Sequence, residues 1–170
     1  MQPLYDPEAV KPMWQELQAV GIEPLTTAEM VDEAVKKEGS TLIVVNSVCG
    51  CAAGGARPGV MKALQHSVIP DNLGTVFAGV DREAVQRARQ HMADVPPSSP
   101  CIALFKEGKP VFVLERSQIE QMNADMIAVS LSKAFDQECS HQGPSIPPEE
   151  FEKIHPVQKC GSSIPVYGQG

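Results

Sequence analysis

Hydrophobic residues recur at helical spacing in two segments near the start of the chain. In "DPEAVKPMWQELQAVG" they stand at positions 10, 13, 17 and 20, and in "TTAEMVDEAVKKEG" at positions 30, 31, 34 and 35. Steps of three and four residues place side chains on one face of a helix. Asp6 and Thr27 are suited to cap these helices, and Gly21 and Gly39 to end them. The pattern therefore predicts two leading amphipathic helices.

From residue 41 the pattern changes to short apolar runs that alternate with helical segments. "TLIVVN" (41–46) is continuously apolar and β-branched, which predicts a strand buried on both faces. "AAGGARPGVMKALQH" predicts a helix and "TVFAGV" (75–80) a second strand. "DREAVQRARQHM" predicts another helix, with Asp81 as its cap. The order so far is strand, helix, strand, helix.

After the break "VPPSSP", two strands and a helix complete the pattern. "CIALFK" (101–106) and "PVFVLE" (110–115) are joined by "EGK", a short hairpin loop. A last helix is predicted from Ala124 to Gln137, with apolar positions 127, 131, 134 and 135 on its inner face. The whole order, βαβαββα behind two leading helices, predicts an α/β fold with a mixed central sheet flanked by helices.

The chain changes composition beyond Cys139. "SHQGPSIPPEE" is polar with three prolines, and a short helix is expected near residues 148–154. We predict one domain over residues 1–139, followed by a Pro-rich C-terminal tail over residues 140–170.

Bulk composition narrows the class of partner and the compartment. With 170 residues, of which 42% are hydrophobic, the chain can bury one substantial core. A net charge of -7, with only 14 Lys and Arg residues, argues against nucleic acid as a partner. No apolar run approaches the ~20 residues that a membrane span requires, and "MQPLYDPEAV" lacks the regions of a signal peptide. We therefore expect a cytoplasmic protein that contacts neither membrane nor nucleic acid.

The five cysteines are Cys49, Cys51, Cys101, Cys139 and Cys160. In a reducing compartment an odd number of cysteines does not predict a framework of structural disulfides. Catalysis, metal binding and inert burial remain as interpretations.

Cys49 and Cys51 stand where the strand 41–46 turns into a helix. The positive end of the helix dipole and its unpartnered N–H groups favour a thiolate there, and such positions lower a thiol pKa from about 8.5 to roughly 3.5–7.5. Cys49, just outside the first turn, is the predicted nucleophile, and Cys51, inside it, is suited to resolve a mixed disulfide. Gly50 supplies the bend that lets the two thiols meet.

Two other interpretations of this pair stay open. The thiols could be small buried core residues, or they could belong to a metal-binding or metal-delivery module. A structural zinc needs four ligands, and the remaining cysteines and His141 include no second tight pair. We favour thiol chemistry. Pro100 directly precedes a predicted strand, where a cis peptide bond would present the backbone of Ser99 to a substrate held against Cys49.

The element order, the cysteines at the first core helix and the proline before the third strand resemble the thioredoxin superfamily. Within it, "NSVCGCAAGGARPG" is similar to the bacilliredoxin family, and the similarity extends to "TVFAGVDREA", "PPSSPCIALFKEGK" and "IAVSLSKAFDQEC". It covers the chain from about Leu4 to Cys139.

The resemblance implies a thioredoxin-like fold and an enzyme of thiol-disulfide exchange on proteins capped with bacillithiol. Cys49 would be the nucleophile and Cys51 the resolving thiol. No bound cofactor is implied; bacillithiol or a similar low-molecular-weight thiol would be the co-substrate, and S-thiolated client proteins the partners. Disulfide isomerisation is the alternative activity within the same family.

Ser47, Arg57 and Pro100 also match family positions. We expect Ser47 to form a hydrogen bond to a sulfur, and Arg57 to supply positive charge near the site or, equally, to be a solvated helix residue.

The other cysteines are less informative. Cys101 follows Pro100 where a small residue such as Ser is expected; it is either a third thiol near the pair or, as we favour, a buried strand residue. Cys139 matches a family cysteine of undetermined role. The tail with Cys160 is longer than the family pattern, and we favour a surface extension over a homodimer contact or an auxiliary redox thiol.

Overall fold

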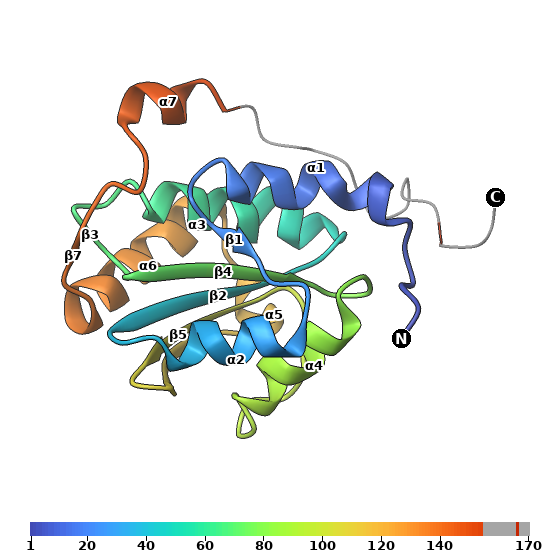
Figure 1. Ribbon diagram of the computed structural model, residues 1–170. Helices are drawn as coiled ribbons and strands as arrows, with labels where there is room; N and C mark the ends of the chain where they lie inside the picture. The colour runs from blue at the N-terminus through green and yellow to red at the C-terminus, as the bar shows by residue number, and fades with distance from the viewer. Residues whose placement is uncertain (155–165, 167–170) are drawn as a thin grey trace.

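A five-stranded sheet runs through the middle of the molecule and carries helices on both faces, as the computed structural model in Figure 1 shows. The structure describes residues 1–154 and residue 166. The helices are α1 (Pro7–Gln18), α2 (Ala28–Lys36), α3 (Arg57–Ala63), α4 (Arg82–Gln90), α5 (Arg116–Ile119), α6 (Ala124–Glu138) and α7 (Pro148–Glu152), with a π-helical turn, η1 (Ala52–Ala56), before α3. The strands are β1 (Glu23–Pro24), β2 (Ser40–Asn46), β3 (Val68–Ile69), β4 (Asn72–Phe77), β5 (Cys101–Lys106), β6 (Lys109–Leu114) and β7 (His141–Gln142).

The sheet is mixed, and its strands lie in the order β1-β4-β2-β5-β6. β1, β4 and β2 are parallel, whereas β5 is antiparallel to both β2 and β6. Val45 of β2 is therefore paired with Val76 on one side and with Cys101 on the other. The predicted βαβαββα order and the mixed sheet are confirmed.

The central strand β2 is buried on both faces, as its continuous apolar run predicts. Leu42 and Val44 pack in the core beneath α3 and α6. Ile43 and Val45 point to the opposite face and pack with α2 and α4. Alternate residues of a strand face opposite sides of the sheet, so a strand with helices on both sides needs apolar residues at every position.

The predicted caps and the hairpin also form. The Asp6 carboxylate accepts a hydrogen bond from the backbone N–H of Glu8, and the Thr27 hydroxyl accepts one from that of Met30. Between β5 and β6, Glu107 and Gly108 both have positive φ, 53° and 79°. This is the backbone of a tight two-residue hairpin, in which glycine is favoured.

The second predicted strand, 75–80, is misplaced by three residues. β4 begins at Asn72, where pairing with β2 starts, and ends at Phe77, after which the N–H of Val80 turns back to the Phe77 carbonyl. β4 has a glycine at position 74 because the Leu25 side chain packs directly over its backbone. A Cβ at this position would lie 2.6 Å from the Leu25 Cδ1. Asp81 stands before α4, but its carboxylate accepts from the Phe77 N–H rather than from the first turn of the helix.

Beyond residue 139 the described part of the tail lies against the core. β7 pairs with β3, and Ser145 donates its N–H to the Leu64 carbonyl. Three apolar residues of this segment are half-buried against the core cluster that includes residues of α3 and α6: Ile146, Phe151 and Ile154. The short helix expected near residues 148–154 is α7. Within the described residues, no helix is long and apolar enough to cross a membrane.

Candidate active site

Three chain segments meet at the edge of the sheet where β2 ends. β2 leads into Ser47 and the two cysteines, and the antiparallel register of β5 brings Pro100 next to the end of β2. β6 is antiparallel to β5, so it ends at this same edge and delivers Arg116 there. The topology thus concentrates two thiols, a hydroxyl and a guanidinium at one edge.

The helix after the cysteines is not regular, although the sequence predicts a single helix. Residues 52–56 form a π-helical turn in which the Arg57 N–H bonds to the Ala52 carbonyl, five residues back. Pro58 follows at the start of α3 and has no N–H to donate. The missing N–H donor explains why the regular series of α-helical hydrogen bonds is interrupted at Pro58. π-turns of this kind occur frequently at functional sites.

The two thiols lie in direct contact. The sulfur atoms of Cys49 and Cys51 are 2.7 Å apart, and the Ser47 hydroxyl donates to the Cys49 sulfur over 3.1 Å. The same hydroxyl accepts from the Cys49 backbone N–H at 3.3 Å. Both cysteines are half-buried, whereas Gly50 between them is exposed. The predicted hydrogen bond from Ser47 to a sulfur is present.

The Cys49 thiol has a lowered pKa. Burial acts to raise it, but hydrogen bonds from Cys51, Ser47 and the Ala52 N–H, together with the charge of Arg116, outweigh burial and lower the pKa below its usual 9.0. Each of these groups stabilises the thiolate form of Cys49.

The Cys51 thiol has the opposite shift. Burial, the hydrogen bond to Cys49 and the negative charge on Cys49 raise the pKa of Cys51 to about 11. Cys49 therefore loses its proton at lower pH than Cys51 does. This arrangement can present one nucleophile while it keeps a second thiol in reserve.

Arg116 is a site residue that the sequence analysis missed. Its Nη1 donates to the Ser99 carbonyl at 3.0 Å and its Nε to Glu120 at 2.7 Å. The bond to Glu120 and the charges on Cys51 and Cys49 raise its pKa. The strand topology was the available signal: a hairpin after β2 returns its second strand to the cysteine edge, and Arg116 is the first cation beyond that strand.

Arg57 is fully buried, so its interpretation as a solvated helix residue is wrong. Its Nε donates to Glu16 of α1 at 2.7 Å, and its Nη1 donates to the Asn46 side chain at 3.1 Å and to the Ser47 carbonyl at 2.8 Å. Burial lowers the pKa of Arg57, and the charges of Glu16 and Cys49 oppose that effect. The positive charge expected near the site lies beneath the cysteine loop and holds its backbone.

The Ser99–Pro100 peptide bond is cis, the conformation expected from the sequence. Pro100 is buried, and Ser99 lines the same pocket as Cys49. The carbonyl of Ser99 is occupied by the Arg116 guanidinium.

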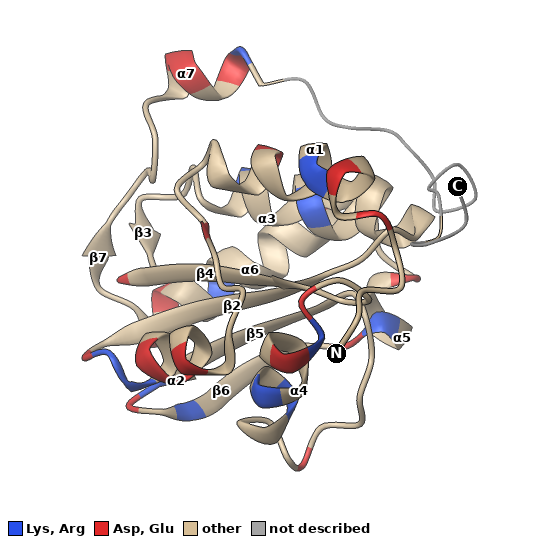
Figure 2. Cartoon of the chain, turned by 45° about the vertical axis from the view of Figure 1, so that its right-hand side comes forward, with Lys and Arg blue, Asp and Glu red and all other residues tan. Residues whose placement is uncertain are grey.

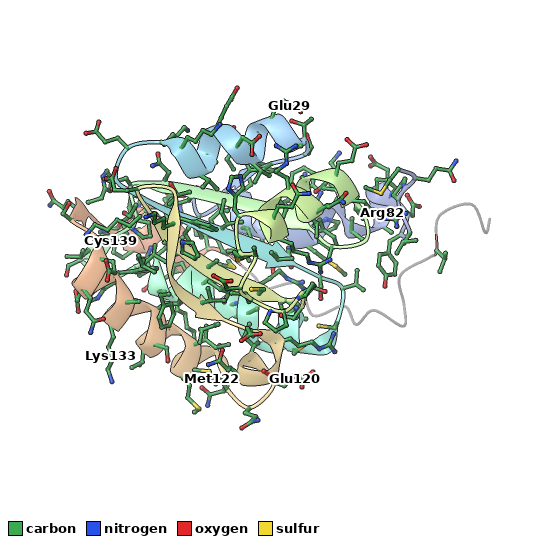
Figure 3. All side chains as sticks on the ribbon, turned by 90° about the horizontal axis from the view of Figure 1, so that it is seen from below. Glu29, Arg82, Glu120, Met122, Lys133 and Cys139 are labelled. Atoms are coloured by element: carbon green, nitrogen blue, oxygen red, sulfur yellow. The ribbon has the colours of Figure 1, made fainter. Side chains whose placement is uncertain are left out.

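Cys101 and Cys139 pack in two different core clusters. Cys101 is 2% exposed in the core with α2 and α4, which confirms the favoured strand interpretation, and burial raises its pKa to about 11. Cys139 ends α6, where burial raises its pKa, on the far side of the molecule from Arg82 in Figure 3. Cys160 lies outside the described residues. Among residues 1–154 and 166, no group of three His, Cys, Asp or Glu side chains is placed to hold a metal ion.

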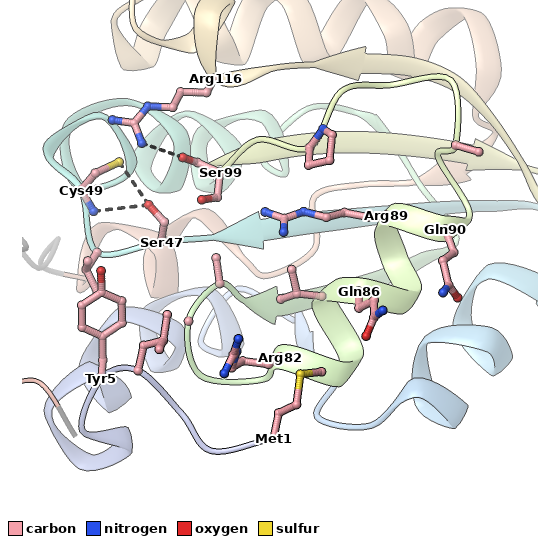
Figure 4. A pocket seen from close by; sticks show the side chains of 17 residues that line it. Met1, Tyr5, Ser47, Cys49, Arg82, Gln86, Arg89, Gln90, Ser99 and Arg116 are labelled. Atoms are coloured by element: carbon pink, nitrogen blue, oxygen red, sulfur yellow. Dashed lines mark hydrogen bonds between the residues drawn. The ribbon is translucent and has the colours of Figure 1, made fainter. Parts of the chain in front are cut away.

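A pocket of ≈ 860 Å³ opens beside Cys49 (Figure 4). Its walls come from the N-terminal segment, the end of β2, helix α4 and the loop before β5. Ser47, Cys49, Ser99 and Arg116 form one end of it. A substrate held in this pocket can place a sulfur atom against Cys49.

Replacement of Ser47 by Ala is expected to slow the reaction of Cys49 with iodoacetamide at pH 7 by about three- to tenfold, the value of one hydrogen bond. The hydroxyl stabilises the thiolate, so its loss raises the Cys49 pKa and moves the pH–rate midpoint to higher pH. Ser47→Thr retains a hydroxyl and is the matched control. An unchanged midpoint in Ser47→Ala would show that this hydrogen bond does not stabilise the thiolate.

Comparison with known proteins agrees with this geometry. The family model described as disulphide isomerase matches residues 5–139. The bacilliredoxin of Cytophaga hutchinsonii is 54% identical over 134 residues, which cover 79% of this chain and 99% of the relative. The bacilliredoxin of Salinibacter ruber is 48% identical over 166 residues and covers 95% of both chains, so it shares the tail beyond residue 139.

The fold has a counterpart among solved structures. One described as having a thioredoxin fold matches with a TM-score of 0.50 at 17% identity, over 69% of this chain and 95% of that chain. The thioredoxin-like fold implied by the sequence motifs is confirmed. On the family match and the two relatives, the chain belongs to the bacilliredoxin family and is a thiol-disulfide oxidoreductase.

Proposed function

We propose that this protein removes a low-molecular-weight thiol, bacillithiol or a similar one, from mixed disulfides on client proteins. The observation that carries the proposal is the contact between two thiols with opposite pKa shifts, Cys49 lowered and Cys51 raised to about 11. A thiol with a lowered pKa attacks disulfides at neutral pH, and a protonated neighbour does not compete with it. This chemistry belongs in a reducing compartment, which supports a cytoplasmic location.

The first step transfers the small thiol to Cys49. The Cys49 thiolate attacks the sulfur of the small thiol, the mixed disulfide breaks, and the client leaves as a thiolate that takes a proton from solvent. Arg116 and the Ala52 N–H, which stabilise the Cys49 thiolate before attack, are placed to stabilise the negative charge shared by the exchanging sulfurs.

The second step frees the small thiol. Once Cys49 has formed a disulfide, it no longer carries the negative charge that raises the Cys51 pKa, so Cys51 ionises more readily. The Cys51 thiolate then attacks the Cys49 sulfur, the small thiol leaves as a thiolate, and Cys49 and Cys51 form a disulfide. A further thiol or dithiol reductant must supply two electrons to reduce this disulfide.

Disulfide isomerisation is the second candidate function, because the matching family model carries that description. An isomerase must keep a mixed disulfide with its client long enough for the client to rearrange. A resolving sulfur in contact with the Cys49 sulfur shortens that lifetime, which favours the removal of small thiols.

The Cys51→Ala variant is expected to accumulate one small thiol per chain on Cys49 after exposure to a bacillithiol-capped protein. Without Cys51 the first adduct cannot be resolved, and intact-mass spectrometry with peptide mapping measures it. Cys49→Ala, with Cys51 in place, is the control that should carry no adduct. A Cys51→Ala protein that leaves the client capped would reject the proposal, and one trapped on the client itself would favour isomerisation.

A further inference from the structure

The pocket beside Cys49 is positively charged within an acidic protein. Three of the chain's five arginines line it, Arg82, Arg89 and Arg116, and its lining includes no Asp or Glu. The whole chain has a net charge of -7. Positive charge is therefore concentrated at a cavity that opens onto the reactive thiol.

Two of these arginines have no carboxylate partner among the described residues. Arg82 donates to the Gln2 carbonyl, and the Nε of Arg89 is buried without any hydrogen-bond partner. Figure 4 shows the Arg89 guanidinium extended from α4 toward the Ser47 end of the pocket. By contrast, Arg87 of the same helix forms an ion pair with Asp32 of α2. Figure 2 shows acidic residues on α2, which lies beside α4.

We propose that Arg82 and Arg89 bind carboxylate groups of the small thiol while its sulfur is attached to Cys49. Guanidinium groups bind carboxylates through paired hydrogen bonds, and no carboxylate within residues 1–154 is paired with either of these two. The volume of ≈ 860 Å³ lies within the range of about 300–1,000 Å³ typical of small-molecule sites, which favours a small thiol over a folded client surface.

The apolar part of the lining suits the carbon skeleton of such a thiol. The apolar lining of the pocket includes Leu4, Tyr5, Val85 and Pro97. The selected substrate is thus a mixed disulfide whose small-thiol half is anionic. This inference rests on the proposed attack by Cys49, and it adds the residues that would select the small thiol.

The test compares two mixed disulfides of 2-thiopyridine, one with mercaptosuccinate, a dicarboxylate, and one with neutral 2-mercaptoethanol. The Cys49 thiolate attacks the sulfur of either small thiol, that thiol remains on Cys49, and 2-thiopyridone leaves with the electron pair and is measured by its absorbance. The ratio of the two second-order rate constants reports selection by charge and cancels the intrinsic reactivity of Cys49. All proteins carry Cys51→Ala so that only the first step is observed.

Each rate constant is first divided by the rate constant of free cysteine with the same probe, which removes the difference in intrinsic reactivity between the probes. After this correction we expect the dicarboxylate to react about tenfold faster than the neutral probe. This is the scale of one or two charge-assisted hydrogen bonds. Arg82→Gln and Arg89→Gln should each lower this ratio, and the double variant should bring it close to one. Arg87→Gln removes a charge from the same helix outside this pocket and should leave the ratio unchanged. The ratio of the two rates, not the rate with either probe alone, is the readout for every variant.

Three outcomes overturn the inference. Equal normalised rates for the two probes would show that the pocket does not select anions. A preference that survives both Arg82→Gln and the double variant would place the selection elsewhere. Failure of Cys49 to react with either probe would instead reject the proposed function, and this inference with it.

Discussion

At neutral pH, iodoacetamide is expected to label Cys49 ahead of Cys51, Cys101 and Cys139. Of these four thiols Cys49 alone has a lowered pKa, because hydrogen bonds and the charge of Arg116 outweigh its burial, whereas burial raises the pKa of each of the other three. A thiol with a pKa of about 11 is ionised to only about one part in ten thousand at pH 7. The expected preference for Cys49 over Cys51 is at least about tenfold. The difference in ionisation is at least about a hundredfold, and the greater nucleophilicity of the more basic Cys51 thiolate offsets part of it.

The direction of the pH dependence follows from the same shifts. The thiolate reacts and the thiol does not, so labelling of Cys49 should rise with pH through a midpoint below 9.0 and then level off. Labelling of Cys101 should still be rising at pH 10, because its pKa is about 11. Peptide mass mapping after short pulses measures each site, in a Cys160→Ser background that removes the cysteine outside the described residues.

Coupling within the pair gives this experiment an internal control. Cys51→Ala removes a hydrogen bond to the Cys49 sulfur, so the Cys49 midpoint should move to higher pH. Cys49→Ala removes a hydrogen bond and a negative charge beside Cys51, so the Cys51 midpoint should move to lower pH. Labelling of Cys49 with an ordinary midpoint, unaffected by Cys51→Ala, would contradict the contact between the two thiols.

The strands and helices around the site follow from local pattern. β2 is covered on both faces and needs apolar residues at every position, and a continuous apolar run such as "TLIVVN" is typical of such a strand. The position of Cys49 and Cys51 follows directly, since a strand that ends at Asn46 and a helix that starts within a few residues leave them at the junction. The local sequence is sufficient here because all the residues that create the thiol environment, apart from Arg116, are close in the chain.

Contacts between segments that are distant in the sequence could not be predicted from local sequence patterns. The Arg57 side chain is buried because Glu16, 41 residues earlier, and the Ser47 carbonyl meet it there, and a helical segment alone does not reveal such partners. Arg116 reaches the thiols only because β6 runs antiparallel to β5. β1 is two residues long and contains a proline, so its parallel pairing with β4 leaves no periodic signal.

The buried ion pair of Arg57 and Glu16 ties helix α1 to the loop that carries the cysteines. Arg57 is 0% exposed and joins Glu16 on α1 to Asn46 and the Ser47 carbonyl at the end of β2. The Asn46 amide in turn donates to the Met13 carbonyl of α1. These bonds fix the backbone on which Ser47 and Cys49 are placed.

Arg57→Met is expected to lower the free energy of unfolding by about 3–5 kcal/mol, the typical cost of removing one partner from a buried ion pair. The change takes the cation away from the buried Glu16 carboxylate and leaves the Ser47 carbonyl without its donor. Urea unfolding followed by circular dichroism measures the loss. Arg87→Met breaks the more exposed pair with Asp32 and should cost no more than about 1 kcal/mol.

Two further variants separate the ion pair from simple loss of packing. Combining Arg57→Met with Glu16→Gln removes the buried negative charge as well, so part of the lost stability should return. Arg57→Lys keeps the charge but lacks the guanidinium fork whose separate nitrogens donate to Glu16 and Ser47, and it should fall between wild type and Arg57→Met. Equal losses for Arg57→Met and Arg87→Met would mean that the Arg57 pair acts as an ordinary surface contact and does not hold the cysteine loop.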